Sequence, residues 1–386
     1  MRVLIIGGGI GGLTAAIALR KAGVDPQVYE RASALREVGA GIGLMANAVQ
    51  ALDALGLGGA IRALSLAGMQ GGLRNSKGEA LMEVPADEFS RQFGAMAVMH
   101  RAALLSALES ELDAARLHLN HEFVRFDQED HGVTAHFNGG GAQRGEVLIG
   151  ADGLRSAVRA QLFGARAPRY AGYTAWRAVV PFEPLPLVTG ETWGRGRRFG
   201  IVPMAGGRVY WFATANAREG ERDPAGQTKS NLLRSFLGWH RPIEALIEAA
   251  DESSILRNDI YDLDPLTAWT QGRVTLLGDA AHPMTPNLGQ GACQAMEDAV
   301  VLAVCLKPAA RPENGLAEYQ RRRIPRTRAI VLQSRRFGQI AQWQSPFLCG
   351  LRDRAVRMTP RALAVRSLKD LVAYHPLSPG DRSLLG

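Results

Sequence analysis

The spacing of apolar positions in the opening residues predicts a strand, a turn, a helix and a second strand. Residues 2–6 form a short apolar run that is typical of a buried strand. Residues 13–22 have the composition of a helix, and Gly23 follows where a helix C-terminus favours glycine. Residues 27–29 predict a second strand, which leads directly into Glu30.

The turn between the first strand and the helix carries the motif Gly7-x-Gly9-x-x-Gly12. In such a turn the first glycine allows the tight bend, the second lets a pyrophosphate approach, and the third lets helix and strand pack closely. The N–H groups at the start of the helix would face the phosphates. A glycine motif alone is weak evidence, but the order and spacing of the elements favour a bound dinucleotide, either NAD or FAD.

Glu30 stands where its carboxylate can accept hydrogen bonds from both hydroxyls of a ribose. The same charge would repel a 2′-phosphate. Arg31 could favour a phosphorylated ribose, but the preceding carboxylate argues more strongly against one.

The rest of the chain alternates between elements of this domain and a second region that is rich in strands. Strands and turns are predicted at 68–84 and from 173 to about 261, where most of the tryptophans fall. A β-sheet of this kind could cover a flavin or another flat ligand. The other predicted elements are helices at 44–55, 102–115, 292–306, 316–338 and 360–373, a hairpin of strands 117–126 and 132–137, and strands at 146–149 and 273–277.

One hairpin of the strand-rich region can be worked out in register. Residues 197–204 and 208–215 flank Ala205-Gly206-Gly207, and a three-residue loop would pair Met204 with Arg208. Side chains alternate between the faces of a strand, so Arg198 and Tyr210 would then share one face. A two-residue loop would place them on opposite faces. We favour the three-residue loop.

Two more glycine-containing turns follow predicted strands. Gly150-Ala151-Asp152-Gly153 precedes a helix, so Asp152 could cap that helix or fix part of a cofactor. The second turn is Gly278-Asp279-Ala280-Ala281-His282. After it, residues 286–291 form a loop dense in proline and glycine, which predicts a fixed turn that presents free N–H groups of the next helix to an anion.

The composition excludes several classes of protein. The formal charge of +8 comes almost entirely from arginine, and no basic patch with interleaved aromatics predicts nucleic-acid binding. No apolar run reaches the length of a membrane span, and the basic helix at 360–373 is expected to pack on the surface. Three widely spaced cysteines and eight histidines predict neither disulfides nor a metal site, and a cytoplasmic location is expected.

Together, the three glycine turns resemble the three motifs of the FAD-dependent aromatic hydroxylases, the class A flavoprotein monooxygenases. The resemblance covers residues 1 to about 328. It implies FAD and an α/β fold, in which a Rossmann-type FAD-binding domain holds an inserted β-sheet substrate domain and ends in C-terminal helices. The expected limits are 1–70, 97–172 and 265–345 for the FAD-binding domain, 71–96 and 173–264 for the substrate domain, and 346–386 for the C-terminal helical segment.

The same resemblance assigns roles at the cofactor. Arg101 and Asp279 would lie near the ribityl and pyrophosphate groups, and Val124 would touch the adenine through its backbone. The N–H groups of residues 289–293 would face the pyrimidine edge of the flavin, where a helix N-terminus stabilises negative charge. The full set of expected FAD contacts is Gly7, Gly9, Gly11, Gly12, Glu30, Arg31, Gly43, Arg101, Val124, Asp152, Asp279, Gly289, Gln290, Gly291, Ala292 and Cys293.

The resemblance also implies the reaction. NADH or NADPH would bind transiently and reduce the flavin, and O2 would then hydroxylate a small aromatic or N-heteroaromatic ring through a flavin C4a-hydroperoxide. A flavin reductase or dehydrogenase that does not oxygenate its ligand is the alternative enzyme. The oligomeric state is not indicated.

Residues 169–173, Arg198, Tyr210 and the block 279–299 resemble the FAD-dependent urate hydroxylase branch, in which the arginine and the tyrosine meet the substrate. That branch has an acid where this chain has Asn287, so urate itself is in question. Salicylate-like or hydroxynicotinate-like acids remain open as substrates, with Arg198 as the carboxylate partner.

Overall fold

A computed structural model describes residues 1–386 except 36–39, 67–70, 85–93, 95, 184–188, 308 and 383–386. The first layer is a six-stranded sheet with the order β17-β18-β11-β1-β2-β7. Neighbouring strands pair in parallel, except β17 and β18. The sheet confirms the expected Rossmann-type α/β fold. The strands are β1 (Arg2–Ile6), β2 (Asp25–Tyr29), β7 (Leu117–His118), β11 (Val147–Gly150), β17 (Thr270–Gln271) and β18 (Val274–Leu276).

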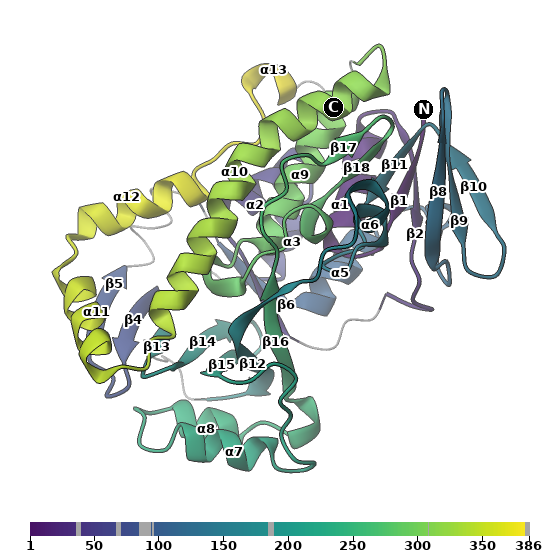
Figure 1. Ribbon diagram of the computed structural model, residues 1–386. Coiled ribbons are helices and arrows are strands. Elements are labelled where there is room, and N and C mark those ends of the chain that lie inside the picture. The colour runs from purple at the N-terminus through teal and green to yellow at the C-terminus, as the bar shows by residue number, and fades with distance from the viewer. Residues whose placement is uncertain are drawn as a thin grey trace.

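Two helices, α1 (Ile10–Lys21) and α9 (Gly291–Leu306), pack against each other beside this sheet (Figure 1). Every residue of α9 from Cys293 onward is buried, as expected for a helix that is apolar on nearly all sides. Apart from α7 and α8, which belong to the second layer, the further helices of the described residues are α2 (Ala46–Ala54), α3 (Gly58–Ala63), α5 (Arg101–Glu109), α6 (Ala157–Phe163), α10 (Pro312–Ala341), α11 (Pro346–Met358), α12 (Arg361–Val372) and α13 (Pro379–Arg382).

The second layer is a seven-stranded sheet with the order β16-β12-β15-β14-β13-β4-β5. Its pairs are antiparallel except β13 and β4, which run in parallel. One face packs on α7 (Thr228–Ser235) and α8 (Ile243–Glu248) around Phe199, Trp211 and Phe236. The strands are β4 (Gly71–Asn75), β5 (Ala80–Val84), β12 (Arg169–Pro181), β13 (Gly190–Trp193), β14 (Arg197–Met204), β15 (Arg208–Asn216) and β16 (Leu256–Asp262).

The predicted register of the β14–β15 hairpin is confirmed. Met204 pairs with Arg208, Val202 with Tyr210, and Arg198 with Thr214. Arg198 and Tyr210 therefore share one face, which is the face opposite the α7–α8 core.

Several predicted boundaries were wrong. Residues 117–126 do not form one strand, because β7 joins the parallel sheet and a separate strand, β8 (Phe123–Glu129), starts the hairpin. β8 pairs with β9 (Gly132–Phe137), and β9 also pairs with β10 (Ala142–Gly145), a strand that the sequence did not predict. The helix predicted to reach residue 115 ends at Glu109, and a separate 3-10 turn covers Ala114–Arg116. β12 begins at Arg169, four residues before the position where the strand-rich region was expected to start.

A two-stranded sheet of β3 (Gly41–Leu44) and β6 (Ala97–His100) completes the strands in the described residues. Among those residues, no helix combines the length and the apolar character needed to cross a membrane.

Candidate active site

The first glycine turn leaves room for a ligand at one position and none at the other two. A Cβ on Gly12 would lie 1.9 Å from the carbonyl oxygen of Gly7, and a Cβ on Gly7 would lie 2.4 Å from that of Ala151. Around Gly9, by contrast, no described atom lies within 4 Å of a Cβ. Gly9 also precedes α1 without a side-chain cap, so the first N–H groups of the helix are available to a phosphate.

Glu30 is held at the end of β2 by backbone donors. Its Oε2 accepts from the N–H of Gly8 (2.7 Å) and its Oε1 from the N–H of Ala32 (2.9 Å). The main chain of residues 30–32 bonds to that of residues 118–121, shortly before β8. Val124 lies at an irregularity in the pairing of β8 with β9, which separates it from the regular ladder. Val124 thus follows three residues after a segment that is bonded to the Glu30 turn, and Arg31 is exposed.

Asp152 makes the contacts of a helix cap. Its Oδ2 accepts from the N–H groups of Ala157 (2.8 Å) and Val158 (3.1 Å) at the start of α6. The buried Arg159 of the same helix donates to the carbonyl of Ala280 (2.8 Å). Arg159 therefore ties the second glycine turn to the third. The sequence analysis missed Arg159, because nothing in its local pattern distinguishes it from a surface arginine.

Asp279 lies in the 3-10 turn Gly278–Ala280. Its side chain is accessible to solvent, but enough protein lies around it to reduce its hydration. Withdrawal from bulk water raises the pKa of the Asp279 carboxyl, against the opposing charges of His282, Arg101 and Arg159. Arg101 begins α5, and burial lowers its pKa while Asp279 opposes that shift. Asp279 and Arg101 therefore interact electrostatically, and both are accessible. Such a pair is suited to binding polar groups of a cofactor.

The loop before α9 is a tight turn that ends in a left-handed backbone conformation, which favours glycine. Residues Pro286–Leu288 form a 3-10 turn, and Gly289 follows with φ 62°, in the left-handed region. α9 then starts without a side-chain cap at Gln290. The Cys293 thiol bonds to the carbonyl of Gly289 (3.5 Å), and burial raises its pKa to about 12. Cys293 is therefore a structural thiol, and only its N–H remains a candidate for the flavin.

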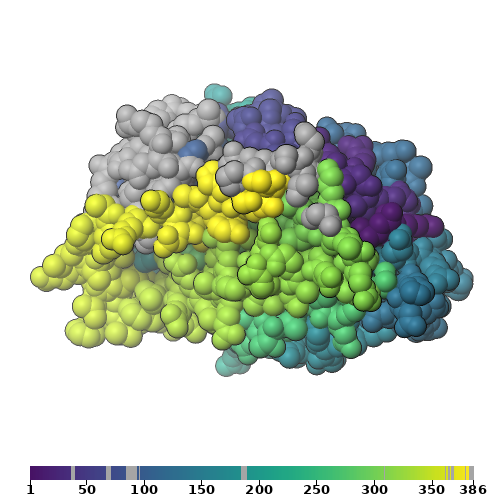
Figure 2. Space-filling model, turned by 90° about the horizontal axis from the view of Figure 1, so that it is seen from above, coloured from purple at the N-terminus to yellow at the C-terminus, as the bar shows by residue number. Residues whose placement is uncertain are grey.

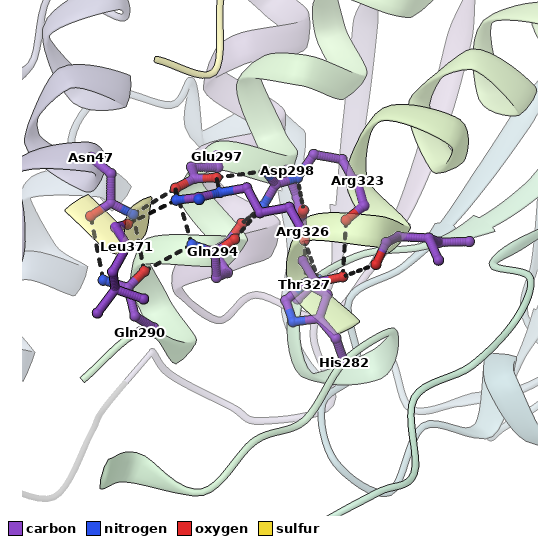
Figure 3. Close-up of polar contacts among 12 residues, drawn as sticks. Asn47, His282, Gln290, Gln294, Glu297, Asp298, Arg323, Arg326, Thr327 and Leu371 are labelled. Atoms are coloured by element: carbon purple, nitrogen blue, oxygen red, sulfur yellow. Dashed lines mark hydrogen bonds and ion pairs between the residues drawn. The ribbon is translucent and has the colours of Figure 1, made fainter. Parts of the chain in front are cut away.

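A buried polar network fixes the position of α9 (Figure 3). Asn47 of α2 donates to Gln290 Oε1 (3.0 Å) and to Glu297 Oε1 (2.5 Å). Arg326 of α10 forms two bonds of 2.8 Å to the Glu297 carboxylate and also donates to the carbonyls of residues 370 and 371. The helix start that would face the flavin is therefore connected to α2, α10 and the end of α12.

The other half of the network surrounds Asp298. Its Oδ1 accepts from Arg323 Nε (2.6 Å), and its Oδ2 lies 2.6 Å from His282 Nε2 and accepts from the N–H of Gly278 (3.1 Å). Burial alone would raise the pKa of Asp298, but His282 and Arg323 outweigh it and lower the pKa to about 2. Asp298 thus holds the turn that contains Asp279.

Arg198 is surrounded by protein acceptors. Its three donating nitrogens bond to Gln342 Oε1 (3.0 Å), Glu191 Oε1 (3.0 Å) and Asn287 Oδ1 (2.8 Å). The Arg198 side chain is only 1% exposed, and Glu191 compensates its charge. Asn287 also accepts from the hydroxyl of Tyr173 (3.0 Å). Arg198 therefore links the seven-stranded sheet to the loop before α9.

Tyr210 lies elsewhere on the same face and is half-buried. Its hydroxyl is hydrogen-bonded to Arg177, and burial raises its pKa. Its ring packs on Gly41 of β3, where a Cβ would lie 2.3 Å from Tyr210 Cγ. At Gly41 the seven-stranded sheet therefore packs closely against β3, the strand that also contains Gly43. The sequence analysis did not select Gly41, although the glycine-rich segment 39–43 was a signal.

Three comparisons with known proteins agree with this geometry. The family described as FAD binding domain matches residues 1–334. The aurachin C monooxygenase/isomerase of Stigmatella aurantiaca is 46% identical over 361 residues, which are 93% of this chain and 94% of that protein. The 2-heptyl-3-hydroxy-4(1H)-quinolone synthase of Pseudomonas aeruginosa is 37% identical over 374 residues, 94% and 95% of the two chains. The crystal structure of Klebsiella pneumoniae HpxO complexed with FAD and uric acid has a TM-score of 0.92 at 30% identity and 98% coverage of both chains.

The fold and the site define a flavin-dependent monooxygenase that acts on aromatic or N-heteroaromatic compounds. The chain belongs to the FAD binding domain family. The expectation that FAD is the cofactor is confirmed, and the residues fit it: Gly9 leaves space for a pyrophosphate, and α1 and α9 both begin without side-chain caps.

Proposed function

We propose that this monooxygenase uses NADH or NADPH to hydroxylate a neutral N-heteroaromatic ring of the 4(1H)-quinolone kind. The observation that carries the proposal is the ion pair of Arg198 with Glu191 at 3.0 Å. An arginine that recognises an anionic ring needs an uncompensated charge and free donors. Here Glu191 balances the charge, and three of the five N–H groups, one each on Nε, Nη1 and Nη2, already have protein acceptors. The name of the quinolone synthase among the relatives supports the same class of substrate.

In this proposal the substrate lies on the free face of the seven-stranded sheet. Tyr210, Val202 and Phe212 are half-buried there and supply aromatic and apolar contacts. The Tyr210 hydroxyl, fixed by Arg177, would orient the ring carbonyl or N–H. Arg198 acts as a positioning residue, because it reaches the loop before α9 through Asn287.

We further propose how the chain serves FAD. The cofactor, when bound, supplies the electron transfer from NAD(P)H and the activation of O2. The Gly9 turn and the α1 N-terminus would hold the pyrophosphate, Glu30 the ribose, and Asp279 with Arg101 the ribityl region. The N–H groups at the α9 N-terminus would stabilise negative charge on the pyrimidine edge. Dependence on NAD(P)H and three buried thiols support a cytoplasmic location.

A substrate panel tests the proposal directly. Purified holoenzyme is given NADH or NADPH with neutral 2-alkyl-4(1H)-quinolones, with urate, or with salicylate and hydroxynicotinate. We expect the quinolones to stimulate NAD(P)H oxidation and to yield a product heavier by one oxygen atom in mass spectrometry. Coupled hydroxylation of the anionic rings alone would overturn the neutral-substrate proposal. NAD(P)H loss that gives only peroxide with every ligand would instead favour the reductase.

A single substitution isolates the role of the ion pair. Glu191→Gln removes the compensating charge from Arg198 and should raise kcat/KM for an anionic aromatic acid by about tenfold relative to a neutral quinolone. Glu83→Gln is the matched control, because Glu83 pairs with Arg74 (2.8 Å) in the same sheet but is exposed. An unchanged preference in Glu191→Gln would show that the Arg198 charge does not govern substrate choice.

A further inference from the structure

Helix α11 turns apolar side chains toward the solvent. Phe347, Leu351 and Met358 have exposed fractions of 77%, 54% and 69%. They are spaced by four and seven residues, so they lie on one side of the helix. A surface helix normally buries such a stripe.

The opposite side of α11 is firmly attached to the protein. Arg352 is buried, donates to the carbonyls of Ala341 (3.1 Å) and Gly194 (3.3 Å), and stacks over the ring of Trp193 at 4.9 Å. Cys349 is also buried and bonds to the carbonyl of Trp343 (3.2 Å). These contacts fix the orientation of α11, so its apolar stripe faces the solvent.

Positive charge accompanies the apolar stripe. Arg354 falls between Leu351 and Met358 on the exposed side of α11, and it has no ion-pair partner in the part of the chain that the structure describes. α12 follows with exposed Arg366 and Lys369, and Leu363 is 56% exposed. Of the other arginines of α11, Arg352 is buried on the opposite side and Arg357 pairs with Glu79 at 2.7 Å, so the positive charge available near the stripe comes from Arg354, Arg366 and Lys369. Figure 2 shows α11 at one edge of the molecule and α12 running from it across the visible face.

We propose that α11 and the exposed side of α12 bind the surface of an anionic membrane. An apolar stripe with interleaved arginine is the pattern of a helix that lies in the interface of a bilayer, and basic residues add attraction to anionic lipids. α11 has 13 residues, too few to span the hydrocarbon core, so the contact is peripheral. A second copy of this chain is a poorer occupant, because a symmetric contact would bring the same arginines together.

The inference does not depend on the identity of the substrate. It departs from the expectation that the basic helix at 360–373 packs on the surface, and the exposed stripe lies mainly on α11. A monooxygenase held at a membrane would meet lipophilic aromatic compounds where they concentrate.

Vesicle flotation of the FAD-loaded full-length protein tests the proposal. We expect binding to vesicles of phosphatidylglycerol mixed with phosphatidylcholine, weaker binding at high salt, and little binding to phosphatidylcholine alone. The variant Phe347→Ser/Leu351→Ser/Met358→Ser should lower the partition coefficient by at least about tenfold, since each burial of a large apolar side chain is worth about that factor. Arg354→Glu should weaken binding to the anionic vesicles only.

Leu237→Ser is the matched control, because Leu237 is 74% exposed but lies beyond α7 on the substrate domain. It should bind vesicles like the wild type, and all variants should keep their FAD content and basal NAD(P)H oxidation. The proposal is overturned if the wild type does not float with anionic vesicles, or if the triple variant binds as well as the wild type. A dimer in light scattering that the triple variant abolishes, without any vesicle binding, would assign the stripe to a second copy instead.

Discussion

Gly338→Ala should destabilise the protein, although the same change in a helix normally stabilises. Gly338 lies in α10, where alanine is favoured by up to about 1 kcal/mol over glycine. A Cβ at this position would lie 2.2 Å from Asn287 Nδ2, and a contact below 3 Å forces a displacement. The substitution therefore moves the Asn287 amide.

The cost follows from the bonds that the amide makes. Asn287 accepts from Tyr173 and Arg198, and it donates to Thr285 Oγ1 (2.8 Å) and the carbonyl of Ser334 (2.9 Å). A neutral hydrogen bond contributes about 1 kcal/mol and one to a charged group about 1.5–3 kcal/mol, so loss of the set costs roughly 4–6 kcal/mol. Partial repacking and the gain in helix propensity reduce this to a net destabilisation of about 2–4 kcal/mol.

Thermal unfolding of four variants measures the effect: Gly338→Ala, Gly350→Ala, Asn287→Ala and Asn287→Ala/Gly338→Ala. Gly350→Ala in α11 is the control, because no described atom lies within 4 Å of its Cβ and the change should raise the melting temperature. Gly338→Ala should lower it. In an Asn287→Ala background the clash is absent, so Gly338→Ala should become neutral or stabilising. A Gly338→Ala protein that melts as high as Gly350→Ala would refute the reasoning.

Three further predictions concern the cofactor and the buried network. Gly9→Ala keeps an allowed backbone conformation but puts a methyl group where the pyrophosphate approaches. The affinity for FAD, measured by fluorescence titration, should fall about tenfold or more, while the apoprotein melts at nearly the same temperature. An unchanged affinity would count against the pyrophosphate site. Asp279→Ala should weaken FAD retention by roughly ten- to a hundredfold, and a protein that stays fully yellow through dialysis would contradict the assignment. Because the pKa of Asp298 is lowered from 3.8 to about 2, its contribution to stability is present above about pH 4 and is lost as the pH falls toward 2. Asp298→Asn should therefore be less stable than the wild type at neutral pH and should lose less stability between about pH 4 and pH 2. Parallel profiles of stability against pH for the two proteins would reject this prediction.

The sequence predicted those features that depend on neighbouring residues. The β1–α1–β2 unit followed from local periodicity and the glycine spacing, and the β14–β15 register followed from the length of one loop. The two strands that were misplaced or missed, β7 and β10, are only two and four residues long, too short to show a clear pattern.

Contacts between distant segments could not be predicted. Arg159, Arg323 and Gly338 have ordinary local surroundings, and their partners lie more than a hundred, about 25 and about 50 positions away in the chain. The sequence analysis selected Arg198 as a substrate-binding residue, and that role stays a prediction. It could not reveal that Glu191, Gln342 and Asn287 converge on Arg198. The individual contacts to FAD and the domain limits stay predictions.

The parallel pairing of β13 with β4 constrains how this enzyme can be engineered. Glu191 pairs with Leu73, so a strand from early in the chain completes a sheet built mostly from residues 169–262. A chimera that exchanged only the later segment with that of another hydroxylase would graft a foreign β13 onto the native β4. Mismatch at that seam would leave an open strand edge, which promotes aggregation. Recombination for new substrate specificity should therefore exchange residues 71–84 together with residues 169–262, so that all strands of the sheet come from one protein.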